Sequence, residues 1–393
     1  MTQKPGIGVI LKSGKEKPIK NFHHWIFSGA IQSAPEFSDG DILAVYSSTQ
    51  EFLGHAYFNS RTSISGRMIA WGDELVDDAI EKRIFSAIQM REKIFSDADT
   101  NAYRLINSEG DGLPGLIVDK YNKILVIQIA TAGMEKLKEK VIKILSEKLA
   151  PEAIYEKSDI PSRREEGLKL FEGLLAGKMP ENVEIVEQGR KFFVDILTGQ
   201  KTGFFLDQRE MRGYVEKISA GKNVLNCFGY TGGFSVYSAV GRAKKVTTVD
   251  ISENALQTAE KNFILNGLGV DNHDFIVADA FDYLRNEPLN FDLIILDPPA
   301  FAKKKDDVVQ ACRGYKDINR VVLSKMPPQS ILVTSSCSYH IDPGLFQQVI
   351  FQATREANRR VRIIGRHLQA PDHPLNIYHP EGEYLKSLVL FVE

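Results

Sequence analysis

The sequence predicts an α/β fold class with three modules: an N-terminal small β-barrel (residues 1–72), a central α+β domain (73–185) and a C-terminal doubly wound, seven-stranded domain (186–393). Three observations lead to this expectation. A chain of 393 residues exceeds one ordinary hydrophobic core. The first seventy residues hold short apolar runs between turn residues, whereas the second half alternates apolar runs with helix-length segments.

The first module is read from five apolar runs, GIGVIL, HWIF, DILAVYS, FLGHAYF and SGRMIA, separated by Gly, Ser, Asn and Asp. Short runs of this kind are typical of a small antiparallel sheet or barrel. Residues 73–95 then show helical periodicity with an acidic first turn, so we place a boundary near Gly72.

The central module combines expected strands in YRLINSEGDGLPGLIVDKY, KILVIQIA and AIYEKS with an amphipathic helix in MEKLKEKVIKILSEKL. The stretch LLAGKMPENV, which contains Gly and Pro, reads as a linker to the last module.

The last module contains seven expected strands, NVLNCF, KVTTVD, DFIVAD, FDLIILD, ILVTSS, RIIG and SLVLFV, with helical patterns between them. Continuous apolar strands separated by helices predict a parallel sheet covered on both faces. Ligands of such sheets bind beyond the carboxyl ends of the strands, so the functional residues are expected there.

Composition excludes several other classes of protein. The hydrophobic fraction of 43% and the charged fraction of 25% are those of a globular chain. No apolar run has membrane-spanning length and the N-terminus lacks a signal-peptide core, so a cytoplasmic protein without membrane contact is expected. Three cysteines without paired spacing disfavour disulfides and a zinc site, so no metal is predicted.

Four successive strand ends carry polar or glycine signals. The stretch VLNCFGYTGGFSV forms a glycine-bearing turn, and Asp250, Asp279 and Asp297 end the next three strands. An acid after the second strand can accept hydrogen bonds from ribose hydroxyls. A ligand-free turn and a helix N-cap are the ordinary alternatives for a single motif, but the four together favour a nucleoside-containing cofactor.

With these motifs the module resembles the class I S-adenosylmethionine-dependent methyltransferases, which implies a Rossmann-like fold and S-adenosylmethionine as cofactor. The resemblance implies contacts to the methionine part, the ribose and the adenine in turn from Asn226, Phe228, Gly229, Tyr230, Thr231 and Gly232, from Asp250, Ile251 and Ser252, and from Asp279, Ala280 and Phe281. It places Asp297 beside the acceptor. Asn226 stands where many members have an acid, which implies that backbone carbonyls hold part of the methionine ammonium.

The stretch TSSCS follows the fifth strand and places Cys337 beside the loop that begins at Asp297. An unpaired cysteine is usually a small buried hydrophobe, and we interpret Cys227 and Cys312 in that way. The serines around Cys337 favour a nucleophile instead. Thiolate addition at carbon 6 of a pyrimidine would make its carbon 5 nucleophilic, with Asp297 hydrogen-bonding the base.

Six ordered motifs narrow the resemblance: INSEGDGLPGLIVDKY, EKSDIPSRREEGL, GQKTGFFLDQREMR, DPPAF, TSSCS, and APDHP followed by PEGEYLK. Together they resemble the bacterial 23S ribosomal RNA cytosine-5 methyltransferases with an N-terminal PUA domain. This resemblance implies a PUA fold for residues 1–72 and an RNA partner. Gln208 and Arg209 are candidates for polar contacts with the cofactor, with a helix start as the alternative.

Two rival functions stay open at this point. One is methylation of a base nitrogen in RNA, for which Cys337 would be dispensable. The other is a non-catalytic RNA-binding ribosome assembly factor that retains the cofactor fold. Basic residues at 303–305 and Arg359, Arg360 and Arg362 are candidates for phosphate contacts. The oligomeric state is open, with a homodimer among the expectations.

Overall fold

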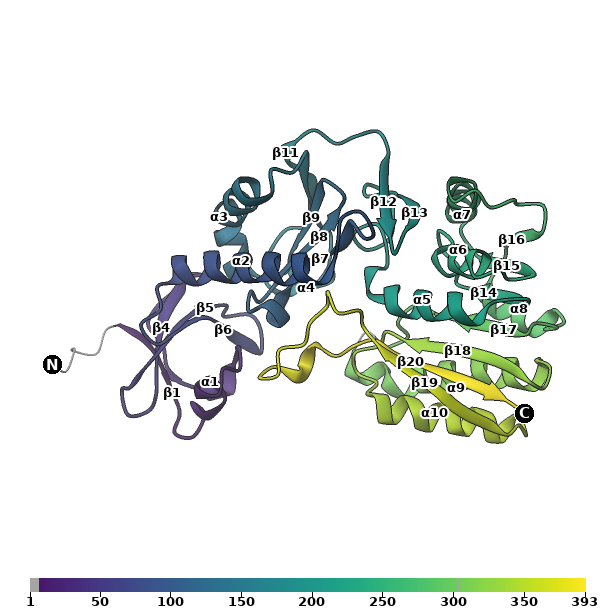
Figure 1. The fold of residues 1–393 in the computed structure, drawn as a ribbon. Helices are drawn as coiled ribbons and strands as arrows, with labels where there is room; N and C mark the ends of the chain where they lie inside the picture. Colours follow the sequence, from purple (N-terminus) through teal and green to yellow (C-terminus); the bar gives the residue numbers. More distant parts are fainter. Residues whose placement is uncertain (1–6, 303) are drawn as a thin grey trace. The chain divides into compact units, whose positions relative to one another are not determined.

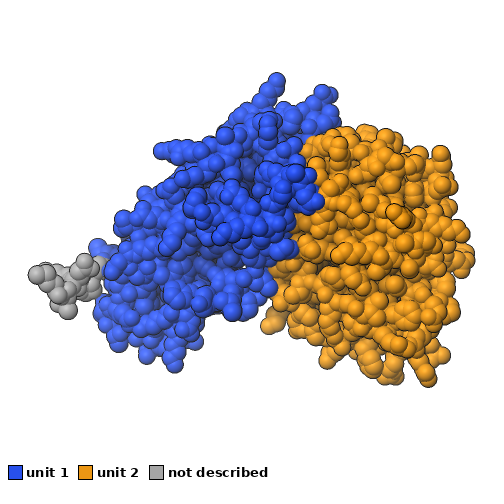
Figure 2. Space-filling model, in the orientation of Figure 1, with its two compact units in different colours: residues 1–183, 194–204, 371–382 blue, residues 184–193, 205–370, 383–393 orange. Residues whose placement is uncertain are grey.

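A computed structural model describes residues 7–302 and 304–393 (Figure 1). The chain divides into two compact units, coloured separately in Figure 2. Unit 1 comprises residues 1–183, 194–204 and 371–382, and unit 2 comprises residues 184–193, 205–370 and 383–393. Each unit is described by itself. Within the described residues, no helix combines the length and apolarity that a membrane crossing requires.

Unit 1 begins with a six-stranded β-sheet in the order β2-β6-β5-β4-β1-β3. The strands are β1 (Gly8–Leu11), β2 (Trp25–Phe27), β3 (Ile31–Ser33), β4 (Ile42–Tyr46), β5 (Phe52–Phe58) and β6 (Ile64–Trp71), with helices α1 (Lys17–Lys20) and η1 (Ser28–Ala30) between them. The predicted small barrel is confirmed, although β1 pairs with β4 in parallel and not antiparallel. Val9, Leu11, Val45, Phe58 and Met68 are buried at its centre.

The second part of unit 1 is a five-stranded sheet in the order β11-β10-β9-β8-β7. Its elements are α2 (Val76–Ile94), β7 (Ala102–Asn107), η2 (Ser108–Asp111), β8 (Leu116–Tyr121), β9 (Ile124–Ile129), α3 (Ala132–Leu149), β10 (Ala153–Ser158), α4 (Pro161–Glu165) and β11 (Phe171–Gly177). Tyr57 and Ile69 of the barrel belong to the core of this second sheet. The two parts therefore share apolar packing across the boundary proposed at Gly72, and that boundary stays a prediction.

A two-stranded ribbon, β12 (Val183–Glu187) and β13 (Arg190–Val194), precedes the doubly wound sheet. The seven-stranded sheet of unit 2 has the order β16-β15-β14-β17-β18-β20-β19. Its strands are β14 (Asn223–Cys227), β15 (Lys245–Asp250), β16 (His273–Val277), β17 (Leu293–Leu296), β18 (Ser330–Ser336), β19 (Val361–Leu368) and β20 (Lys386–Val392). All seven predicted strands are present, which confirms the doubly wound fold class.

The helices of unit 2 lie on both sides of this sheet in Figure 1. They are η3 (Leu206–Gln208), α5 (Arg209–Ile218), α6 (Gly233–Val240), α7 (Glu253–Leu265), α8 (Ala280–Asn286), η4 (Lys305–Asp307), α9 (Val308–Lys325) and α10 (Pro343–Glu356), whereas η5 (Pro380–Gly382) belongs to unit 1. Leu225, Ile294 and Leu332 of three adjacent strands are fully buried among them. Burial on both faces explains why these strands read as continuous apolar runs.

The last strand corrects the expectation of a wholly parallel sheet. β20 is antiparallel to both β18 and β19, whereas β14 to β18 pair in parallel. Parallel neighbours need a crossover connection, usually a helix, but the segment between β19 and β20 contains only η5. The chain therefore returns into the sheet in the opposite direction, beside β18.

Candidate active site and cofactor-binding loops

The turn after β14 has a backbone that ordinary residues rarely adopt. Phe228 has φ of 60°, Tyr230 has φ of 46° and Gly232 has φ of 78°. Left-handed conformations at non-glycine residues cost on the order of 1 kcal/mol or more each and concentrate at functional sites. Gly229 is required for a different reason, because an added Cβ would lie 2.3 Å from Cγ2 of Thr248. The turn is therefore held tightly against β15.

Two buried polar atoms of this turn have no hydrogen-bond partner: Oδ1 of Asn226 and Oγ1 of Thr231. The Asn226 amide donates to Oγ of Ser235 over 2.9 Å, so only its oxygen is left over. Buried acceptors normally have a donor, and a ligand ammonium at the end of β14 would supply one. The residues present thus fit the methionine part of the predicted cofactor, with the Asn226 side chain as an acceptor beside the predicted backbone carbonyls.

Asp250 ends β15 and fixes the glycine turn. Its Oδ2 accepts the backbone N–H of Tyr230 over 2.8 Å, and its Oδ1 accepts that of Ser252 over 2.9 Å. Each carboxylate oxygen keeps a second lone pair, on which a ribose hydroxyl can donate. Ser252 caps α7 through Ala255, which leaves the acid unneeded as a cap. Ile251 next to it is 72% exposed, and the contacts of Ile251 and Ser252 with the cofactor stay predictions.

Asp279 serves as the N-cap of α8, because its Oδ1 accepts the backbone N–H groups of Phe281 and Asp282 over 2.8 and 3.1 Å. The ordinary alternative to a ligand contact is therefore realised at this acid. Ala280 is buried, and the Phe281 ring makes an edge contact with that of Phe228 at 5.7 Å. Contacts of these residues with the adenine stay a prediction.

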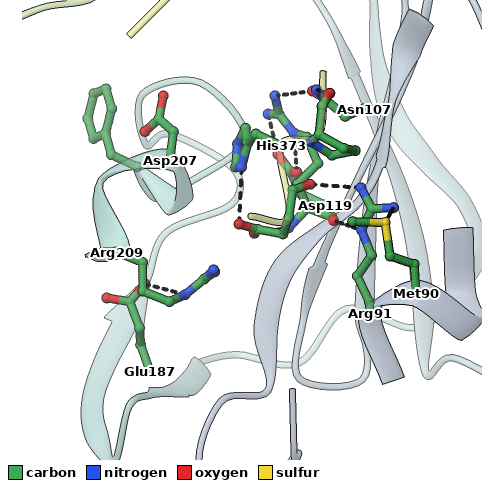
Figure 3. Close-up of polar contacts among 12 residues, drawn as sticks. Met90, Arg91, Asn107, Asp119, Glu187, Asp207, Arg209 and His373 are labelled. Carbon is green, nitrogen blue, oxygen red and sulfur yellow. Dashed lines mark hydrogen bonds and ion pairs between the residues drawn. The ribbon is translucent and has the colours of Figure 1, made fainter. Parts of the chain in front are cut away.

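Gln208 and Arg209 are adjacent in sequence but have different partners. The Gln208 amide donates to Oδ1 of Asp297 over 2.9 Å, while its own Oε1 is buried without a partner. Arg209 is fully buried and lies 3.4 Å from the Glu187 carboxylate (Figure 3), which also accepts two bonds from Arg212. Gln208 therefore orients the Asp297 carboxylate, whereas Arg209 belongs to a buried ion-pair cluster. Direct cofactor contacts of the two stay predictions.

Cys337 follows β18 directly and is partly exposed. Its Sγ lies 3.9 Å from the carbonyl oxygen of Pro298 in the DPPAF loop. The parallel pairing of Leu296 with Thr334 brings the two loops to the same sheet edge. The structure thus joins Cys337 to the loop that starts with Asp297, as the order of the motifs predicts.

Ser338 connects the loop after β18 to the DPPAF loop by a hydrogen bond, a role that the sequence analysis missed. Its Oγ accepts the backbone N–H of Ala302 over 3.2 Å and bonds the hydroxyl of Tyr315 at 3.0 Å. Ser338 and Tyr315 are fully buried. The two polar side chains come from a loop and from the middle of α9, so no local pattern could have paired them.

The other two cysteines differ from Cys337. Cys227 is completely buried in β14, and burial raises the pKa of its thiol. Burial also raises the pKa of the Cys312 thiol on α9. A thiol whose anion is disfavoured is a poor nucleophile, in agreement with the structural interpretation of both residues.

Two of the basic residues considered for phosphate contacts are engaged within unit 2. Arg359 donates to the carbonyl oxygens of Glu393 and Met326 over 3.0 and 2.9 Å, and Arg362 pairs with the Glu393 carboxylate. Lys303 lies outside the described residues.

One cluster of metal-type ligands occurs among the described residues, in unit 1: His23, His379 and Glu381. Nε2 of His23 lies 3.2 Å from the Glu381 carboxylate, and its Nδ1 accepts the backbone N–H of Trp25 over 3.1 Å. A neutral imidazole has one N–H and one lone pair, so that proton resides on Nε2 and points at Glu381. A metal at Nε2 would break this arrangement, and the cluster reads as a hydrogen-bonded one.

Comparisons with known proteins agree with this geometry. Residues 170–387 match the family model of the S-adenosylmethionine-dependent methyltransferases, and residues 9–71 match that of the PUA-like domain. The chain is 41% identical to the ribosomal RNA large subunit methyltransferase I of Photobacterium profundum, over 98% of this chain and 99% of that protein. It is also 41% identical to the protein of the same name from Aeromonas salmonicida, over 97% and 98% of the two chains. A solved structure of a methyltransferase complexed with SAH has a TM-score of 0.85 and 26% identity, and covers 98% of this chain and 100% of that one.

Proposed function

The chain belongs to the S-adenosylmethionine-dependent methyltransferases, and on that premise we propose that it methylates carbon 5 of a cytosine in RNA through a covalent adduct at Cys337. The observation that carries the proposal is the joining of two loops. Cys337 stands 3.9 Å from the Pro298 carbonyl, in the loop whose first residue is Asp297. Cys337 as the nucleophile and the Asp297 carboxylate would thus both act on the base that accepts the methyl group.

The substrate class comes from the relatives and from the first module. The relatives from Photobacterium profundum and Aeromonas salmonicida are named for ribosomal RNA of the large subunit, and residues 9–71 match a PUA-like domain. These findings support 23S ribosomal RNA as the substrate and a cytoplasmic place of action, where that RNA is found. A homodimer stays a prediction.

The reaction requires the chain to raise the nucleophilicity of carbon 5. The Cys337 thiolate adds to carbon 6 of the cytosine, and the electron pair of the 5,6 double bond shifts to carbon 5, in conjugation with carbon 4 and N3, while Asp297 hydrogen-bonds the base edge. The bound cofactor would supply an electrophilic methyl group to carbon 5, with S-adenosylhomocysteine as the leaving group. A base then removes the carbon 5 proton, and elimination of the thiolate restores the double bond.

Gln208 supports this role of Asp297. The amide bond of 2.9 Å fixes one carboxylate oxygen, so that the other faces a defined direction. Gln208, the last residue of η3, is thus one partner of the Asp297 carboxylate. Pro298 and Pro299 stiffen the same loop, since each proline fixes its own φ. The carboxylate is therefore pre-oriented before the substrate arrives.

The test uses RNA that contains 5-fluorocytidine. Fluorine at carbon 5 cannot leave as a proton does, so the wild-type protein should remain covalently bound to the RNA and migrate as a retarded band under denaturing conditions. Cys337→Ala should lose both trapping and methylation while it still binds the cofactor. Cys312→Ala, the matched control, should keep both.

The rival functions give different results in the same assay. Substantial methylation by Cys337→Ala would contradict the adduct and favour methylation of a base nitrogen. Absence of methyl transfer by the wild-type protein, with large-subunit RNA from cells that lack this protein as substrate, would favour the non-catalytic assembly factor.

A further inference from the structure

Lys386 is a buried lysine next to the cysteine turn. It begins β20 and pairs with Ser336 of β18, the residue before Cys337. The residue is only 4% exposed. The ammonium donates to the carbonyl oxygen of Ser338 over 2.5 Å and to that of Tyr384 over 2.8 Å. The ammonium therefore binds the residue that follows the nucleophile.

Within the described part of the chain, the partners of this ammonium are these two carbonyl oxygens, and it forms no ion pair with a carboxylate. Lysines are almost never buried unless they are paired, because a lone charge loses its hydration. Two carbonyl oxygens replace part of that hydration, and an ammonium has a third N–H. The surroundings of Lys386 thus suit an ammonium whose anionic partner forms only when a neighbouring group loses its proton.

The ionisable groups around Lys386 identify that partner. Burial is the main effect and lowers the pKa of the Lys386 ammonium to about 8, while the Cys337 thiol is the foremost group that acts in the opposite direction, ahead of Glu383 and Asp342. Tyr315 reaches the turn from α9 through Ser338. Of these groups, the thiol belongs to the proposed nucleophile, and its anion would restore the missing negative charge.

We propose that Lys386 is a positioning residue whose ammonium is the counter-charge of the Cys337 thiolate. The proposal rests on the function proposed above, since it assigns the state in which Cys337 attacks. The thiol proton leaves to solvent, and Lys386 stays protonated throughout. Its bond to the Ser338 carbonyl also fixes the turn that carries the sulfur, so that charge and geometry come from one side chain.

The test measures the thiol pKa of Cys337 without RNA, so its outcome is separate from that of the methylation assay. The full-length protein is alkylated with iodoacetamide at a series of pH values, and the rate is read for the Cys337 peptide by mass spectrometry. In Lys386→Met the pH midpoint should rise by about one unit, which corresponds to roughly tenfold slower alkylation below the midpoint. Lys386→Arg, which keeps the charge, should stay close to the wild type.

A matched control separates charge from carbonyl binding. The Lys325 ammonium donates to the carbonyl oxygens of Leu284, Arg285 and Glu287, so Lys325→Met removes a similar cap elsewhere in unit 2 and should leave the Cys337 midpoint unchanged. The Cys312 peptide provides an internal control in every sample. An unchanged Cys337 midpoint in a folded Lys386→Met protein would overturn the proposal.

A reciprocal measurement covers the case in which Lys386→Met does not fold. Interaction between two charges is mutual, so removal of the thiol must lower the pKa of Lys386. A ¹³Cε-lysine NMR titration should show the Lys386 resonance titrating at lower pH in Cys337→Ala than in the wild type, with Lys325 unaffected. Identical titration of Lys386 in both proteins would refute the pairing.

Discussion

Replacement of Asp250 by asparagine tests the predicted cofactor site most directly, because this carboxylate anchors the glycine turn and is also predicted to bind the ribose. In the structure its two oxygens accept the backbone N–H groups of Tyr230 and Ser252 over 2.8 and 2.9 Å. Asparagine has a single acceptor oxygen, and its amide group would face one of these donors. Asp250→Asn should therefore weaken both the turn and the hold on the ribose.

The expected magnitude follows from the bonds that are lost. Hydrogen bonds to a charged group contribute about 1.5–3 kcal/mol each. Weakening of two such bonds to the ribose should reduce cofactor binding by about 2–4 kcal/mol, or roughly 30- to 700-fold in Kd. The loss of one backbone bond should lower the stability of the cofactor-free protein by a further ~1 kcal/mol.

Isothermal titration calorimetry with S-adenosylhomocysteine measures the first effect, and urea denaturation of the cofactor-free protein measures the second. Glu253→Gln removes an exposed acid three residues away in the first turn of α7 and should leave Kd within about twofold of the wild type, since a distant exposed charge is screened. If Asp250→Asn lowers stability but binds the cofactor as tightly as Glu253→Gln, the carboxylate only anchors the turn.

Two further predictions concern buried charges. Glu187→Gln leaves the Arg212 guanidinium, which makes bonds of 2.8 and 2.7 Å to that carboxylate, without its counter-charge; urea denaturation should show a loss of about 3–5 kcal/mol, whereas Glu184→Gln on the same strand should cost about 1 kcal/mol at most. Equal effects of the two would contradict the ion-pair reading. Burial lowers the pKa of His24 from 6.5 to about 4, so the unfolded chain binds the extra proton between these values. The contribution of the neutral His24 side chain to the unfolding free energy is on the order of 3 kcal/mol; it is complete above pH 6.5 and is lost as the pH falls to 4. In urea denaturation at a series of pH values, His24→Gln should reduce the dependence of the unfolding free energy on pH over this range. An unchanged dependence would show that other groups cause it.

The strand ends were predictable because each combines a buried apolar run with a polar residue where the run stops. This pattern located Asp250 at the last position of β15, and Asp297 and Cys337 directly after β17 and β18. Periodicity along the chain determines these positions, and the parallel pairing of neighbouring strands then brings their ends to one edge.

The partners of these residues could not be predicted in the same way. The Gln208 amide on Asp297 and the Ser338 hydroxyl on Ala302 join residues that are far apart in sequence. Lys386 reads as an ordinary surface lysine at the start of a strand, and its burial depends on β20 lying between β18 and β19. The pattern of a single sequence indicates on which face of a helix or sheet a residue lies, but not which distant side chain contacts it there.

The division of unit 1 among separated stretches of sequence affects how the chain is made. Arg91 of α2, labelled in Figure 3, is fully buried. Its guanidinium donates to the Asp111 carboxylate and to the carbonyl oxygen of Asp372. Asp372 lies in the segment 371–382, which leaves the ribosome after nearly all of unit 2 has been synthesised. Domains usually fold in the order of their synthesis. Here, however, the Arg91 guanidinium in the first half of the chain lacks one of its hydrogen-bond acceptors until the segment 371–382 has been synthesised. We expect a folding intermediate during translation that holds the two β-sheets of unit 1 and stays open until residue 372 arrives.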